Sequence, residues 1–169
     1  MAKITSEEGF VLEFELLPRS KEDIFEKYFP VRCSLMYQNK PILNEDILRR
    51  DSDYSRSGFP GGFVGEEIDS FSLIEDLEYV RDNRKSRIWT SFPHEDLEVA
   101  IYPGLFPYIG EHDSEYFTFM FYPCGCRFKD VNVCSRSPVC FVMSPDLNEY
   151  NKFIEDLKKE YEQLKSLNV

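Results

Sequence analysis

An apolar stripe near the end of the sequence places the strongest constraint on the fold. Six apolar side chains recur there at intervals of three and four residues, at Leu147, Tyr150, Ile154, Leu157, Tyr161 and Leu164. This spacing predicts one face of an α-helix about five turns long, and Ser144 followed by Pro145 and Asp146 predicts its start, with Ser144 as the N-cap. Such a face must be buried, either in a coiled coil or against a sheet.

Segments of alternating apolar residues supply the material for that sheet. They are GFVLEFELL (9–17), VRCSLMYQ (31–38), the pair KSRIWTSFP and DLEVAIYPG as a hairpin (85–93 and 96–104), YFTFMFYP (116–123) and PVCFVMS (138–144). A second amphipathic helix is predicted over 66–82. The order of strands, helix, strands and helix indicates an α+β fold, with a mostly antiparallel sheet packed against an acidic amphipathic helix and a long C-terminal helix. With 169 residues and no visible linker, we expect a single domain over 1–169.

The charge of the chain is strongly negative. There are 31 acidic and 20 basic residues, a formal net charge of −11. This balance disfavours nucleic acid and anionic membranes as partners and favours a basic protein surface, although acidity that serves only solubility is an equal alternative. No apolar stretch is long enough for a membrane span and no secretory signal opens the sequence, so we expect a cytoplasmic protein.

Four of the five cysteines, Cys124, Cys126, Cys134 and Cys140, lie within eighteen residues. Their spacing matches the usual zinc ligand pairs poorly, and a reduced cysteine often packs as a small apolar side chain. His94 and His112 each have acidic neighbours, which is a second weak indication of a metal site. No nucleophile elbow or glycine-rich nucleotide motif is present. We therefore expect no enzyme activity and no cofactor; the alternative is a zinc-stabilised module or a metal-dependent enzyme that uses these residues.

The second half of the chain resembles the WapI-type bacterial immunity proteins, which neutralise a partner toxin. The resemblance lies in the order of IDSFSLIEDLEYV, RIWTSF with LEVAIYPG, YFTFMFYP, and PVCFVMSPDLNEYNKFIEDLKKEYEQL. It covers residues 66 to 167 and implies a non-enzymatic inhibitor of a cognate toxin.

The charge distribution indicates where such an inhibitor would bind. Residues 66–82 carry seven acids against Arg81 alone. Carboxylates on one helix would speed association with a basic toxin surface, although a charged run is also the ordinary exposed face of a helix. The predicted partner-binding residues are Glu66, Glu67, Asp69, Glu75, Asp76 and Glu78.

Overall fold

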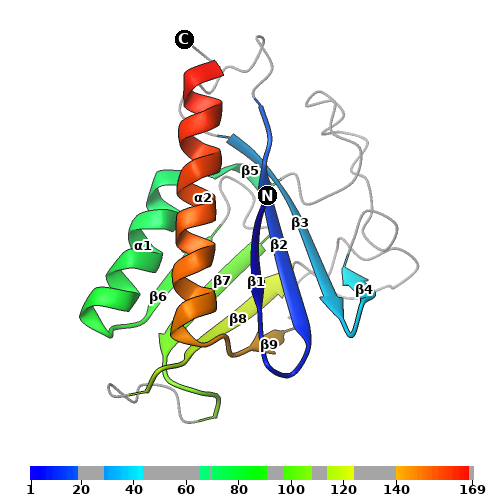
Figure 1. The fold of residues 1–169 in the computed structure, drawn as a ribbon, viewed down its shortest axis with the longest axis vertical. Helices are drawn as coiled ribbons and strands as arrows, with labels where there is room; N and C mark the ends of the chain where they lie inside the picture. The colour runs from blue at the N-terminus through cyan, green and yellow to red at the C-terminus, as the bar shows by residue number, and fades with distance from the viewer. Residues whose placement is uncertain are drawn as a thin grey trace.

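The computed structural model describes residues 1–18, 29–43, 65–68, 70–90, 97–107, 114–123 and 140–167. Two antiparallel sheets and two helices form from these residues, which confirms the predicted α+β class (Figure 1). The chain order is β1 (Ala2–Thr5), β2 (Phe10–Leu16), β3 (Phe29–Tyr37), β4 (Lys40–Leu43), β5 (Gly65–Ile68), α1 (Ser70–Asn83), β6 (Arg87–Thr90), β7 (Leu97–Pro103), β8 (Phe117–Pro123), β9 (Phe141–Met143) and α2 (Leu147–Leu167).

The first sheet is built on the alternating segment that was predicted as the first strand. Its order is β1, β2, β3 and β4, and β5 also pairs with β3. In β2 the side chains of Leu12, Phe14 and Leu16 are buried, as the period of two predicts. Gln38 and Asn39 both have positive φ, of 48° and 62°, and join β3 to β4 in a two-residue turn of the kind that suits the twist of a hairpin.

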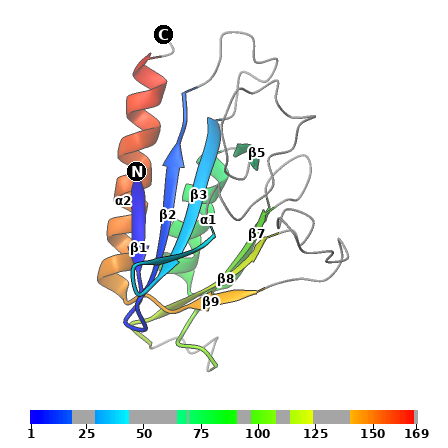
Figure 2. The same cartoon turned by 90° about the vertical axis from the view of Figure 1, so that its right-hand side faces the viewer.

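The second sheet has the order β6, β7, β8 and β9. The predicted hairpin is present, since β6 and β7 pair with Ile88 opposite Ala100. Val99 and Ile101 of β7 are buried on one face, together with Phe117, Phe119 and Phe121 of β8. The strands of this sheet run obliquely to those of the first (Figure 2). One mostly antiparallel sheet was expected, whereas the described strands divide between two.

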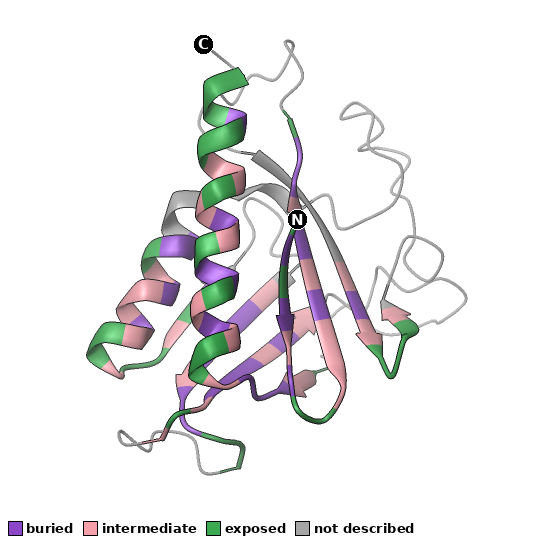
Figure 3. Cartoon of the chain, viewed as in Figure 1, coloured by how far each residue is buried: buried purple, intermediate pink, exposed green. Residues whose placement is uncertain are grey.

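The two helices lie side by side and cover different sheets (Figure 1). Helix α2 packs on β1 and β2, and α1 packs on β6 and β7. The predicted stripe of α1 is confirmed: Leu73, Ile74, Leu77 and Val80 are all buried (Figure 3). The stripe of α2 is confirmed in Tyr150, Ile154, Leu157 and Leu164, while Leu147 is 37% exposed. Phe153, which the stripe did not include, is also buried.

Phe153 explains how one helix serves both sheets. Its ring meets Phe14 of the first sheet edge-on, with ring centroids 5.8 Å apart, and Phe119 of the second sheet at 6.2 Å. Tyr150, one turn earlier, stacks on Phe117 at 3.9 Å. Edge-to-face rings separated by 5.8 and 6.2 Å are favourable beyond their buried area. A single hydrophobic cluster therefore contains side chains from both sheets and both helices.

The start of α2 differs from its prediction. Asp146 is the N-cap, because its Oδ1 accepts a hydrogen bond of 2.8 Å from the backbone N–H of Glu149. The buried hydroxyl of Ser144 instead lies 3.2 Å from that of Thr118, and the Thr118 hydroxyl donates to the carbonyl oxygen of Gly104 at 2.8 Å. Since the single hydroxyl proton of Thr118 is used in that bond, Ser144 donates to Thr118. Among the described residues, no helix N–H donates to the Ser144 hydroxyl, so Ser144 does not cap the helix.

Candidate functional site

The predicted acidic helix is shorter than its sequence suggested. It begins at Ser70, and Glu66 and Glu67 belong to strand β5. The reason is pairing with β3, in which Ile68 lies opposite Phe29 and Gly65 lies opposite Val31. Asp69 lies outside the described residues. The prediction that all six acids share one helix was therefore wrong, and only Glu75, Asp76 and Glu78 lie on α1.

These three acids have different surroundings. Glu75 is exposed and forms no ion pair among the described residues. Asp76 lies 3.4 Å from the Nε of Arg87, whose guanidinium also lies 3.6 Å from the centroid of the Tyr79 ring. Burial raises the pKa of Asp76 above its ordinary value, Arg87 opposes that shift, and Glu75 adds to it. Asp76 is thus held by a neighbouring strand, whereas Glu75 has no ionic partner in the part of the chain that the structure describes.

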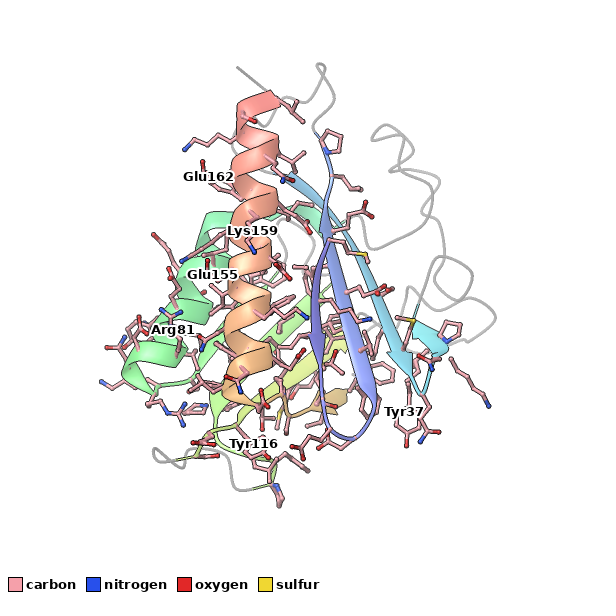
Figure 4. The ribbon with its side chains drawn as sticks, viewed as in Figure 1. Tyr37, Arg81, Tyr116, Glu155, Lys159 and Glu162 are labelled. Carbon is pink, nitrogen blue, oxygen red and sulfur yellow. The ribbon has the colours of Figure 1, made fainter. Side chains whose placement is uncertain are left out.

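Glu78 connects the two helices. Its Oε1 accepts a hydrogen bond of 2.7 Å from the Nζ of Lys158 on α2 and lies 3.5 Å from Arg81, one turn along α1. Figure 4 labels Arg81 on α1. The hydrogen bond from Lys158 to Glu78 is the main cause of the raised pKa of Lys158. Arg81 donates in turn to Asp82 at 2.7 Å, which lowers the pKa of Asp82. Some acids of α1 therefore form ion pairs with basic side chains of the same chain, and others face solvent.

A second group of acids lies at the start of α2 and was not predicted. Thr5, Ser6, Glu7, Asp146 and Glu149 line a depression of about 230 Å³ between the β1–β2 turn and the helix N-terminus. The hydroxyl of Tyr116 donates to Glu7 Oε1 at 3.1 Å, and this bond raises the pKa of Tyr116. The sequence contains one signal for this group. Glu149 follows Asp146 by three residues, and an acid three residues after an N-cap is typical of a capping box at the start of a helix.

Two residues that line this depression each carry a buried polar atom with no hydrogen-bond partner among the described residues. These atoms are the Oγ of Ser6 and the Oε2 of Glu149. Ser6 as a whole is 4% exposed. Buried polar groups are nearly always hydrogen-bonded, so these two atoms are expected to have a partner that the described residues do not supply.

The predicted metal ligands lie mostly outside the described residues. This applies to Cys124, Cys126, Cys134, His94 and His112. Cys140 is an exposed free thiol. Burial raises the pKa of Tyr122 to about 12, and the nearby Cys140 side chain adds to this shift. Across the described ranges, no group of three or more His, Cys, Asp or Glu side chains is arranged to hold a metal ion.

No helix among the described residues has the length and apolar character needed to cross a membrane. Comparisons with protein-family models, with curated proteins and with solved structures find no match to this chain. The resemblance to immunity proteins therefore remains a prediction from the sequence pattern.

Proposed function

We propose that this protein is a non-enzymatic, acidic binding protein that neutralises a cognate bacterial toxin by covering a basic surface of that toxin. The inhibitor role comes from the resemblance of residues 66–167 to WapI-type immunity proteins. The electrostatic mechanism comes from the net charge of −11, which attracts basic proteins over distances comparable to the Debye length.

The observation that carries the proposal is the charge that α1 presents at the surface. The helix contains Glu75, Asp76, Glu78 and Asp82 against Arg81 alone, a net of −3 within Ser70–Asn83. Its apolar stripe is buried against the second sheet. Glu75 and Asp82 are exposed, whereas Asp76 and Glu78 are partly buried beside Arg87 and Lys158. Glu75 forms no internal ion pair among the described residues, and a partner cation would not have to displace one there. Glu75 is therefore the centre of the proposed binding face, and Asp76 and Glu78 contribute through their field.

The test uses a toxin candidate encoded beside the gene for this protein. We expect the wild-type chain to bind it, and Glu75→Lys to lower the association rate about 5-fold to 10-fold at low salt, with less effect at high salt. Glu162→Lys, the same charge change near the end of α2, is the matched control. Glu75 is preferable to Asp76 for this purpose, since Asp76→Lys would also break the contact with Arg87.

Two outcomes would contradict different parts of the proposal. Equal association rates for Glu75→Lys and the wild-type chain would reject α1 as the binding face. Failure of the wild-type chain to bind or inhibit any toxin encoded beside its gene would reject the immunity function itself.

A further inference from the structure

The depression at the start of α2 has more acceptor groups than the described residues use. Asp146 caps the helix through Oδ1, and Glu7 accepts from Tyr116 through Oε1. Both interactions are explained by local structure. Ser6 and Glu149 line the same depression, and their buried Oγ and Oε2 form no hydrogen bond with any described residue. Helix capping alone therefore accounts for Asp146 and leaves the buried hydroxyl and the buried carboxylate oxygen without a role.

The chemistry of these groups selects a cation that donates hydrogen bonds. Carboxylates are acceptors only, and a serine hydroxyl that faces carboxylates accepts from a cation as readily as it donates. The acceptors belong to two separate elements, the β1–β2 turn and α2. A compact ammonium with three rotatable donors suits acceptors on separate elements better than a planar guanidinium, whose donors are fixed in one fork. They are not arranged as metal ligands, since the described part of the chain contains no such group.

Apolar side chains border the same end of the molecule. Leu147 follows Asp146 and is 37% exposed, and Phe106 in the segment after β7 is 48% exposed. Backbone bonding brings that segment to the start of α2, because Gly104 N–H donates to the Tyr116 carbonyl and Tyr116 forms a β-bridge with Asp146. An acidic depression at the same end of the molecule as exposed apolar side chains suits a basic side chain within an apolar segment, since interfaces combine buried anchors with apolar surroundings.

We propose that this depression binds the ammonium group of a lysine side chain of the protein partner, between Ser6, Glu7 and Glu149. The inference rests on the proposed function in that it takes the partner to be a basic protein, and it adds a second contact, distinct from the outer side of α1. In the complex, small rotations of the Ser6 and Glu149 side chains would turn the two buried oxygens into the depression, where the lysine ammonium would donate to them. This converts a destabilising feature of the free protein into a determinant of binding.

The experiment titrates a lysine peptide, acetyl-Leu-Lys-Leu-amide, into the full ¹⁵N-labelled chain and follows the backbone amide signals. We expect saturable shifts centred on Ser6, Glu7 and Glu149. The norleucine peptide of the same shape, which lacks the ammonium, should bind at least about 10-fold more weakly, because charge-assisted hydrogen bonds dominate the contact. The arginine peptide should also bind more weakly.

Two variants make the test specific. Ser6→Ala and Glu149→Gln should each lower the affinity for the lysine peptide about 5-fold. Glu155→Gln, which changes an exposed residue farther along α2, should leave that affinity unchanged. Ser6→Ala should fold at least as well as the wild-type chain, since it removes a buried hydroxyl that has no partner. Equal binding of the lysine and norleucine peptides, or wild-type binding by both variants, would overturn the proposal.

The same variants separate this inference from the proposed function. Capture of a toxin with unchanged affinity by Ser6→Ala and Glu149→Gln would overturn the lysine site and leave the immunity function intact. Specific lysine-peptide binding by a chain that inhibits no neighbouring toxin would support the lysine site and reject the immunity function.

Discussion

The hydroxyl of Tyr150 on α2 donates a hydrogen bond of 2.9 Å to the carbonyl oxygen of Leu77 on α1. The two residues are 73 positions apart in sequence, and both are fully buried. The ring of the same tyrosine stacks on Phe117 of the second sheet. One side chain therefore joins both helices and a sheet, and fixes α1 in the position from which its acids face solvent.

We expect Tyr150→Phe to lower the free energy of unfolding by about 1 kcal/mol, because it removes one buried hydrogen bond and keeps the stacked ring. Urea denaturation with a two-state fit measures the change. Tyr102→Phe is the matched control, since the Tyr102 hydroxyl forms no hydrogen bond with the described residues. An equal loss in both variants would show that the bond to Leu77 makes no special contribution.

Alkaline pH should destabilise the protein through the same residue. Burial raises the pKa of Tyr150 above the ordinary value of 10.0. Below pH 10 both the folded and unfolded states keep the phenol neutral, so the stability contribution of Tyr150 is fully present. Above pH 10 the unfolded state loses this proton and the folded state retains it, and stability falls by up to about 1.4 kcal/mol per pH unit.

Tyr150→Phe should therefore flatten the dependence of the unfolding free energy on pH above 10. Denaturant unfolding at pH 9, 10 and 11 measures both slopes. Tyr122, whose pKa is raised to about 12, should leave a residual slope in the variant. Identical slopes in the variant and the wild-type chain would assign the alkaline loss to other groups.

The ion pair between Glu78 and Lys158 should contribute modestly to the docking of the helices. The side chains are 32% and 38% exposed, so solvent screens their attraction despite the 2.7 Å separation. A double-mutant cycle with Glu78→Gln and Lys158→Met should give a coupling of about 0.5 kcal/mol that decreases in high salt. A coupling near zero at low salt would show that Arg81 alone satisfies Glu78.

The parts of the fold that were predicted are those that depend on local pattern. The buried stripes of α1 and α2 and the alternation in β2 follow from the periods of a helix and a strand. Strand β1 was missed because Ala2 and Ile4 are its only buried apolar residues, and it is recognisable as a strand only through its pairing with β2. Strand β5 was assigned to the helix because it, too, is recognisable as a strand only through its pairing. Its partner β3 lies far away in sequence.

The candidate site was predictable only in its overall charge. Sequence shows where acids are concentrated, but not which of them are neutralised by residues from another element. Lys158 is 80 positions from Glu78, and Arg87 comes from the strand that follows α1. The depression at the start of α2 joins Ser6 to Glu149 from opposite ends of the chain, and no local pattern relates those two residues.

The N-cap of α2 offers a final test, because the sequence suggested Ser144 and the structure assigns Asp146. We expect Asp146→Ala to lower the free energy of unfolding by about 1 kcal/mol, since it leaves the N–H of Glu149 without its acceptor. Asp146→Asn keeps an oxygen at that position and should lose much less. Urea denaturation of both variants, alongside Ser144→Ala, separates the roles. A loss for Ser144→Ala should persist in the background of Asp146→Ala, because the Ser144 hydroxyl bonds Thr118 and not the helix. If the effects of the two alanine substitutions overlapped instead of adding, Ser144 would share in the cap and the assignment of Asp146 as the sole N-cap would fail.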